Sequence, residues 1–223
     1  MAVNTENFNF DPDQLRDKYR QERDKRPRAD GNDQYKEVEG DFKYFVEDPY
    51  TEKVEKNSEN LITEVAIIGG GFGGILAASR LRMSGIDDFK IIEKGGDFGG
   101  TWYWNRYPGA SCDIESYIYF PLLEETKFVP KHKYTNAPET LEYIGKISEK
   151  FNLAENAIFQ TEVTEVIWLE KEGLWKISTN NGDDIRAKYV VHSNGPLNRP
   201  ELPAIEGIND FEGHTFHTSR WDY

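Results

Sequence analysis

A glycine-rich turn between a predicted strand and a predicted helix constrains the fold of this chain more than any other feature. Glu64–Ile68 is a short, β-branched apolar run, which is typical of a buried parallel strand. The segment Gly69–Gly74 follows at once and contains the pattern G-x-G-x-x-G. Gly73–Ser84 has the composition of a helix, and Phe89–Glu93 that of a second strand. The order predicts a β-α-β unit of the kind that binds dinucleotides.

The three glycines of the G-x-G-x-x-G pattern have different predicted roles. Gly69 permits the tight turn, and Gly71 lets the backbone approach a pyrophosphate because it has no Cβ. Gly74 allows the helix to pack closely on the strand. The free N–H groups and the dipole at the start of the predicted helix would hold the phosphates, and Phe72 and Gly73 are further candidate cofactor-binding residues.

Glu93 ends the second predicted strand about 20 residues after the glycine pattern, where a carboxylate can accept hydrogen bonds from a ribose. A carboxylate there would repel a 2′-phosphate, so the site suits FAD or NAD rather than NADP. The alternative is a purely structural glycine turn with Glu93 in solvent.

A long loop rich in glycine and aromatic residues, Gly95–Pro108, comes next and favours FAD over NAD. A flavin ring is large and flat, and it needs apolar and aromatic cover with a few polar groups at its edge. The loop could also be ordinary core. Its candidate cofactor-binding residues are Thr101, Trp102, Tyr103 and Trp104.

The rest of the patterned body predicts one helix and three strands. Pro138–Phe151 suits a helix with proline in its first turn. Phe159–Leu169, Leu174–Thr179 and Ile185–Ser193 are strand-like, and Asn180–Asp183 between the last two is a strong hairpin turn. These three runs predict an antiparallel β-meander.

The first 60 residues form a polar extension, with a predicted helix over Asp13–Arg26. Either this segment packs on the body, or it contacts a partner subunit or further domains. The net charge of −13 argues against nucleic acid or an anionic membrane surface as partner. The one cysteine, Cys112, excludes an internal disulfide and fits a cytoplasmic setting. His132 and His214 have no partners at metal-ligand spacing, so no metal site is predicted.

The end of the chain carries the pattern F-x-G-x-x-x-H-x-x-x-W-D, formed by Phe211, Gly213, His217, Trp221 and Asp222. This signature resembles that of type I Baeyer–Villiger flavin monooxygenases. The sequence G-G-T-W-Y-W-N-R-Y-P-G-A at residues 99–110, followed by C-D and E-S, is also similar to sequences of that family. The resemblance covers about residues 64–223.

The resemblance implies an α/β fold: a Rossmann-like FAD-binding domain, similar to that of glutathione-reductase-like flavoproteins, with an inserted antiparallel meander. It implies an enzyme in which NADPH reduces FAD and O₂ then forms a C4a-peroxyflavin, which converts a ketone to an ester or lactone. Two alternatives stay open, a heteroatom-oxidising flavin monooxygenase and a non-catalytic FAD-binding fragment.

The resemblance also implies roles for particular residues. Asp113 is the candidate catalytic residue, beside the flavin and paired with an arginine from later sequence; alternatively, it caps a helix. Tyr119 and Val163 join the cofactor-binding set. His217 is expected to act in conformational changes rather than as a proton carrier. His192–Pro196 replaces the small-residue turn that runs past FAD in related proteins.

The predicted organisation is a polar extension over residues 1–60, an incomplete FAD-binding domain over 61–205 and a signature segment over 206–223. The sequence holds no second G-x-G-x-x-G after the first, so the NADPH site is expected mostly outside it. We therefore expect an N-terminal piece or a truncated product that cannot complete the reaction alone.

Overall fold

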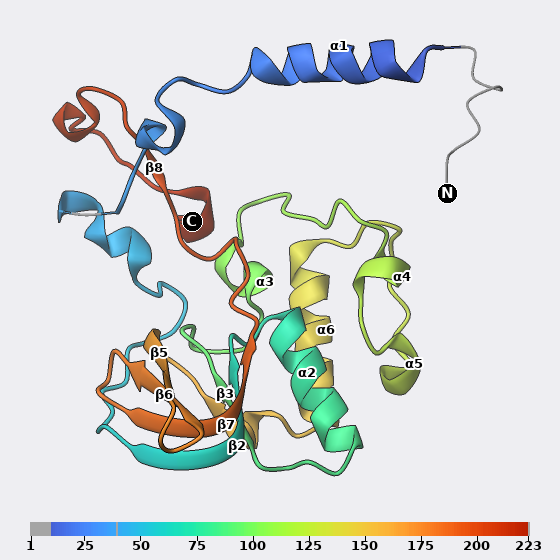
Figure 1. The fold of residues 1–223 in the computed structure, drawn as a ribbon, viewed down its shortest axis with the longest axis vertical. Coiled ribbons are helices and arrows are strands. Elements are labelled where there is room, and N and C mark those ends of the chain that lie inside the picture. The colour runs from blue at the N-terminus through green and yellow to red at the C-terminus, as the bar shows by residue number, and fades with distance from the viewer. Residues whose placement is uncertain (1–9, 39, 223) are drawn as a thin grey trace. The chain divides into compact units, whose positions relative to one another are not determined.

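The computed structural model describes residues 10–38 and 40–222, which fall into two compact units (Figure 1). The first unit contains the residues up to 37 together with 201–212. Its helix α1 (Pro12–Asp24) begins after Asp11, whose carboxylate accepts a hydrogen bond from the Asp13 N–H at 2.9 Å. Strand β1 (Tyr35–Lys36) pairs antiparallel with β8 (Leu202–Pro203). The helix predicted over Asp13–Arg26 is confirmed, with its ends displaced by one or two residues.

The second unit, residues 38–200 with 213–222, is built on a six-stranded sheet of order β4-β3-β2-β7-β6-β5. The first four strands in this order are parallel, and β6 and β5 continue antiparallel. The α/β class, the β-α-β unit and the antiparallel meander are therefore confirmed. The strands are β2 (Asn60–Ile68), β3 (Phe89–Ile92), β4 (Ala157–Ile158), β5 (Val163–Leu169), β6 (Leu174–Thr179) and β7 (Asp184–His192).

Two helices cover one face of this sheet, and Figure 1 shows them side by side. Helix α2 (Phe72–Met83) follows the glycine turn, and α6 (Ala137–Lys150) begins after Asn136, whose side chain accepts a hydrogen bond from Glu139 N–H. Alternate strand residues point to the helices because side chains in a strand alternate between faces. The resulting core contains Val65, Ile67, Phe89 and Ile91 from the strands and Ile75, Ala78, Tyr143, Ile144 and Ile147 from the helices.

The opposite face of the sheet has its own apolar cluster. Ala66 and Ile92, which alternate with the helix-facing residues, pack with Ile177, Ile185 and Ala187 of the meander. The meander thus covers the face that the helices leave free, and the parallel strands are buried on both sides, as their continuous apolar sequence predicts.

Two strand predictions need correction. β2 begins at Asn60 rather than Glu64, because Asn60–Thr63 pair with β7. The run Phe159–Leu169 is not one strand: β4 ends at Ile158, Gln160 has a left-handed φ of 50°, and β5 begins at Val163. Hydrogen bonds from the Gln160 and Thr161 N–H groups to the segment after β3 hold this bend in place.

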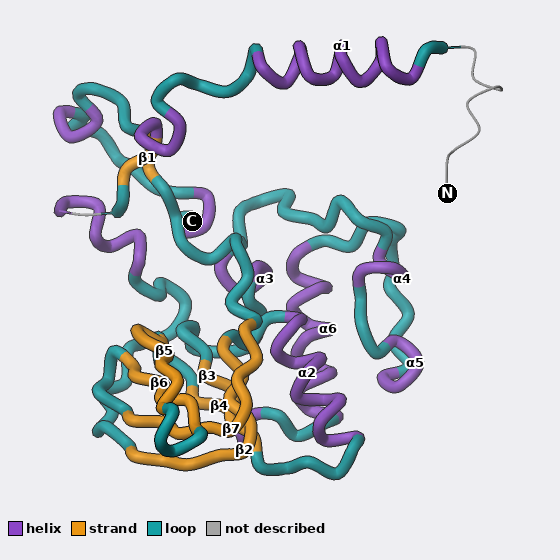
Figure 2. The backbone as a smooth tube through the Cα atoms, in the orientation of Figure 1, coloured by secondary structure: helices purple, strands orange, loops and turns teal. Residues whose placement is uncertain are grey.

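Short helices lie between the longer elements, as the tube in Figure 2 shows, and one of them falls within the predicted loop Gly95–Pro108. Three are α-helical: α3 (Thr101–Trp104), α4 (Ser116–Tyr119) and α5 (Leu123–Thr126). Five are 3-10 turns: η1 (Gly31–Gln34), η2 (Gly40–Val46), η3 (Ala154–Asn156), η4 (Ile208–Asp210) and η5 (Thr218–Arg220). Within the described residues, no helix is long and apolar enough to cross a membrane.

Candidate functional site

At the glycine turn, the backbone at the end of β2, the start of α2 and the residue after β7 lie close together. Gly69 has a φ of +103°, and a Cβ there would lie 2.5 Å from the Ser193 carbonyl oxygen at the end of β7. A Cβ on Gly74 would lie 1.8 Å from the Gly69 carbonyl oxygen. Gly71 precedes α2 and caps it with no side chain, which leaves the helix N-terminus accessible to a ligand.

A cleft of about 520 Å³ opens at this edge of the sheet, beside a smaller hollow of about 180 Å³. β2 lies between β3 and β7 here, and ligands of open α/β sheets bind at the carboxyl ends of such strands. Gly71, Gly100 and the turn after β7 line both spaces, so the two are adjacent. The combined volume falls in the range of small-molecule and cofactor sites.

Most of the predicted cofactor-binding residues line these two spaces. The cleft is lined by Gly69, Gly71, Glu93, Trp104 and Val163. The hollow is lined by Gly71, Phe72, Gly73, Thr101, Trp102 and Tyr119. Gly74 and Tyr103 line neither space and instead support the site from within the fold.

Glu93 is 5% exposed, and its carboxylate accepts two backbone hydrogen bonds. The donors are the N–H groups of Gly70, at 2.5 Å, and Gly95, at 2.6 Å. Burial raises the pKa of Glu93, while these two hydrogen bonds oppose the shift. The carboxylate thus joins the glycine turn to the start of the aromatic loop, at the wall of the cleft.

The aromatic loop is fixed by contacts to distant parts of the chain. Trp102 donates its indole N–H to the Tyr119 hydroxyl at 3.0 Å, so both walls of the hollow are tied together. The Tyr103 hydroxyl donates to Asp48 Oδ2 at 2.5 Å, and burial is the first cause that raises its pKa to about 12. The Asn105 amide donates to the Leu197 carbonyl at 2.9 Å. Because Asp48 belongs to the N-terminal extension, its hydrogen bond with Tyr103 means that this part of the extension packs on the body.

Asp113 lies on an exposed loop and lines neither the cleft nor the hollow. Its charge acts on Tyr119 at the rim of the hollow, where it contributes to a raised pKa whose main cause is burial. The alternative of a helix cap is wrong, because α4 begins after Glu115 and has no side-chain cap. The carboxylate is thus exposed and close enough to Tyr119 for its charge to act there.

Three of the signature residues, His217, Trp221 and Asp222, contact close neighbours in the same stretch of chain. The His217 ring accepts a hydrogen bond from the Ser219 N–H at 3.1 Å and so caps the 3-10 turn η5. Burial, and then the charge of Arg220, lowers the pKa of His217. Trp221 packs edge-on against Phe216, and Asp222 lies 3.0 Å from the His214 ring; Gly213 is an exposed bend.

Sequence reasoning missed two contributors to the site. Asp48 carries no local pattern that points to Tyr103, which lies 55 residues away. Arg220 occupies an unspecified position of the signature, yet it is 6% exposed and stacks on Trp104. Of the residues that the structure describes, no three His, Cys, Asp or Glu side chains are grouped so that they could hold a metal ion.

Fold and site together define an α/β dinucleotide-binding protein. The sequence profile of the pyridine nucleotide-disulphide oxidoreductase family matches residues 66–223, and the chain belongs to this family.

Within this family, the chain is similar to particular curated proteins and solved structures. A Baeyer-Villiger monooxygenase of Streptomyces coelicolor is 46% identical over 94% of this chain and 35% of its own length. The structure of a polycyclic ketone monooxygenase from Thermothelomyces thermophila superposes with a TM-score of 0.82 at 36% identity, over 95% of this chain and 37% of that one. A crystal structure of OTEMO in complex with FAD and NADP gives a TM-score of 0.67 at 32% identity, over 72% and 31%.

These matches confirm the resemblance to Baeyer–Villiger monooxygenases that the sequence motifs indicate. The chain spans about a third of the length of the relatives it matches.

Proposed function

We propose that this chain is the FAD-binding part of an NADPH- and O₂-dependent Baeyer–Villiger monooxygenase that converts ketones to esters or lactones. The observation that carries the proposal is the cleft at the carboxyl end of β2, where the glycine turn, Glu93 and the aromatic loop meet. The relatives named as ketone and Baeyer-Villiger monooxygenases, and the solved complex with FAD and NADP, support it.

The residues present fit FAD. Gly71 and Gly100 face each other so closely that a Cβ on Gly100 would lie 2.7 Å from the Gly71 Cα, which leaves bare backbone for a pyrophosphate. Glu93 would accept hydrogen bonds from the ribose, since each carboxylate oxygen can accept more than one. Trp102 and Tyr119 would provide the apolar wall of the smaller hollow.

When bound and reduced by NADPH, FAD would supply the chemistry that activates O₂. The residues of this chain would hold the cofactor and exclude water around it. We propose that Asp113 orients a cationic partner at the rim of the hollow, supported by its exposure and by its charge near Tyr119. His217, which caps η5 and has a lowered pKa, would serve to hold the signature segment rather than to carry protons.

We further propose that the intact protein acts in the cytoplasm and takes a ketone and O₂, with no nucleic acid or membrane as partner. The strongly negative net charge and the single, buried Cys112 support this.

The test is FAD binding by the 223-residue chain, followed through flavin fluorescence. Gly71→Val is the blocked variant, because even a Cβ at Gly71 would lie 3.3 Å from the Gly100 Cα and the larger side chain would fill the cleft. Gly145→Ala is the matched control, since a Cβ at Gly145 meets nothing within 4 Å. The parent and the control should bind FAD, and Gly71→Val should not. Equal binding by all three would contradict the proposed site.

The reaction is tested on a longer protein that carries this segment, with NADPH, O₂ and a panel of cyclic and aryl ketones. Product analysis should find esters or lactones. Oxidation of amines or sulfides alone would instead favour a heteroatom-oxidising monooxygenase.

A further inference from the structure

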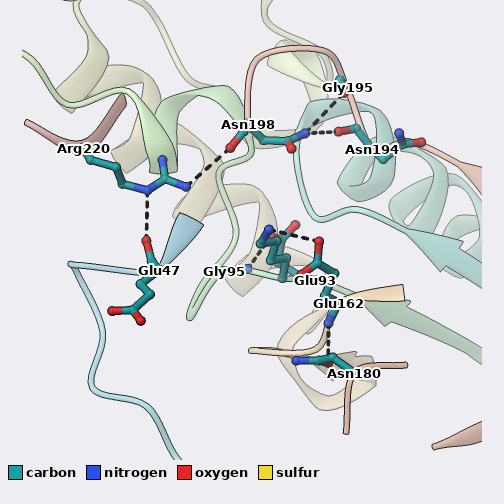
Figure 3. A network of polar contacts seen from close by, with 10 residues as sticks. Glu47, Glu93, Gly95, Glu162, Asn180, Asn194, Gly195, Asn198 and Arg220 are labelled. Carbon is teal, nitrogen blue, oxygen red and sulfur yellow. Dashed lines mark hydrogen bonds and ion pairs between the residues drawn. The ribbon is translucent and has the colours of Figure 1, made fainter. Parts of the chain in front are cut away.

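Arg220 is a buried cation that holds three segments of the chain together (Figure 3). Its Nε donates to the Glu47 carbonyl at 2.9 Å and its Nη1 to the Ser219 carbonyl at 2.6 Å. Its Nη2 reaches the Asn198 carbonyl at 3.5 Å. These acceptors belong to the N-terminal extension, the signature segment and the turn after β7. One guanidinium thus fixes residues 213–222, the described part of the signature segment that lies in the second unit, against two other segments.

The same guanidinium stacks on Trp104, with its carbon 4.1 Å from the centre of the ring. Trp104 and Asn198 both line the cleft. The Asn198 amide donates in turn to the Asn194 carbonyl at 2.5 Å, and so shapes the turn that closes the cleft. Arg220 therefore supports two walls of the cleft from behind while it belongs to the signature segment.

An arginine suits this position better than a lysine. Its planar group can stack on an aromatic ring while its edge donates to several carbonyls, whereas an ammonium is a compact and strongly hydrated point charge. Burial lowers the pKa of Arg220 to about 10, so the side chain stays protonated at neutral pH. Among the described residues, no carboxylate lies within ion-pair distance of it. The cation is held by three backbone carbonyls and the Trp104 ring, and two of these partners, Asn198 and Trp104, line the cleft.

We propose that Arg220 is a positioning residue that couples docking of the signature segment to occupation of the cofactor cleft. This rests on the proposed function, in which the cleft holds FAD. With FAD against Trp104 and the Asn194–Asn198 turn, both supports of Arg220 are fixed, and the signature segment is held more firmly. Because such coupling is reciprocal, a docked segment also favours FAD binding.

The experiment compares the parent protein with Arg220→Lys, which keeps the charge but loses the planar fork. Arg82→Lys is the matched control: Arg82 also stacks on a ring, that of Phe89 at 5.1 Å, and donates to a backbone carbonyl, and it lines neither cavity. FAD affinity is measured by flavin fluorescence. Hydrogen exchange of residues 213–222 is measured with and without FAD.

FAD should slow exchange of residues 213–222 in the parent and in Arg82→Lys by about tenfold, which is within the usual range of coupling between sites. In Arg220→Lys this protection should be lost, and FAD affinity should fall by about the same factor. A variant that is merely less stable would exchange faster everywhere, without a selective loss of the FAD effect in this segment. If Arg220→Lys does not fold, Arg220→Gln provides the same test, because a neutral amide costs less to bury.

Equal protection of residues 213–222 by FAD in the parent and in the folded Arg220 variant would overturn the inference. In that case the parent still binds FAD, and the proposed function stands. If the parent itself binds no FAD, both the proposed function and the coupling are wrong. The two failures are therefore distinguishable.

Discussion

Replacing Glu93 by alanine tests the assignment of the cleft most directly. The carboxylate accepts the N–H groups of Gly70 and Gly95 at 2.5 and 2.6 Å, in a site that is 5% exposed. Hydrogen bonds to a charged group contribute about 1.5–3 kcal/mol. Loss of the equivalent bonds to the ribose of FAD should therefore weaken binding by about 10- to 150-fold. The variant also removes the acceptor of the Gly70 N–H. Because Gly70 neighbours the predicted pyrophosphate site, a less ordered glycine turn should weaken FAD binding further.

The assay is a titration of FAD followed by flavin fluorescence, with thermal unfolding of the cofactor-free protein measured in parallel. Glu162→Gln is the matched control, because Glu162 is a second carboxylate on the cleft wall. Its side chain is 51% exposed and pairs with Lys94 at 3.0 Å. Loss of such an exposed pair should cost about 0–1 kcal/mol. FAD binding by Glu93→Ala as tight as that of the parent would refute the role assigned to Glu93.

The pH dependence gives a second measure of the same group. Burial raises the pKa of Glu93 above its usual 4.5 in the folded protein. Its contribution to stability is therefore complete below pH 4.5 and is lost as the pH rises through the raised folded value. Relative to Glu93→Gln, the cofactor-free parent should lose stability over this window. FAD affinity of the parent should rise over the same window, because the ionised carboxylate is the better acceptor, and that of Glu93→Gln should stay flat.

Three further predictions concern other parts of the site. Gly74→Ala places a Cβ 1.8 Å from the Gly69 carbonyl oxygen, so the free energy of unfolding measured in urea should fall by about 1–3 kcal/mol. Gly145→Ala, in an open position of α6, should instead raise it by up to about 1 kcal/mol. Equal stability of the two variants would contradict the packing argument. His217 has a folded pKa below its usual 6.5, first through burial, so the stability it contributes is present above pH 6.5 and lost as the pH falls through the lowered folded value. Relative to His217→Asn, the parent should show faster hydrogen exchange of residues 213–222 as the pH falls through this window, and identical pH profiles would refute this. In a longer protein that carries this segment, Asp113→Ala should keep its yellow FAD but oxidise ketone at least about a hundredfold more slowly, and an unchanged rate would reduce Asp113 to a surface acid.

Local patterns were sufficient to predict most of the regular structure. The strand, glycine turn and helix around Gly69–Gly74 obey steric rules that depend on adjacent residues, and the structure confirms them. The hairpin at Asn180–Asp183 is confirmed for the same reason. The break at Gln160 coincides with three polar residues, Gln160–Glu162, but the prediction of one strand continued through them and was wrong. The bend is held by hydrogen bonds that Gln160 and Thr161 donate to the carbonyls of Gly95 and Glu93, about 65 positions earlier in the sequence, so no local pattern indicates it.

In the site as well, features set by neighbouring residues could be predicted, and features set by distant contacts could not. The position of Glu93 follows from its spacing to the glycine pattern, but its two backbone donors follow only from the folded loop. Tyr103 was grouped with the cofactor-binding residues because it lies in the aromatic loop; in the fold its hydroxyl faces Asp48 and Thr51 instead. Its neighbour Trp104 does reach the cleft. Sequence can identify such a loop, while the fold decides which of its rings face the cavity.

In the proposed function, the charge at the cleft wall would let the chain distinguish between two dinucleotides. The carboxylate of Glu93 lies at the cleft wall with two donors already bound, so it can accept further hydroxyl protons but has no donor to offer. A 2′-phosphate placed there would meet this carboxylate in a buried setting, where repulsion between like charges is weakly screened. An unphosphorylated ribose meets an acceptor instead. We therefore expect the cleft to prefer FAD to NADPH because of this buried acid, and in the proposed function hydride from NADPH would arrive from a separate site. The signature segment would then matter to both sites, since Arg220 links it to Trp104 and Asn198 on the walls of the cleft that FAD would occupy.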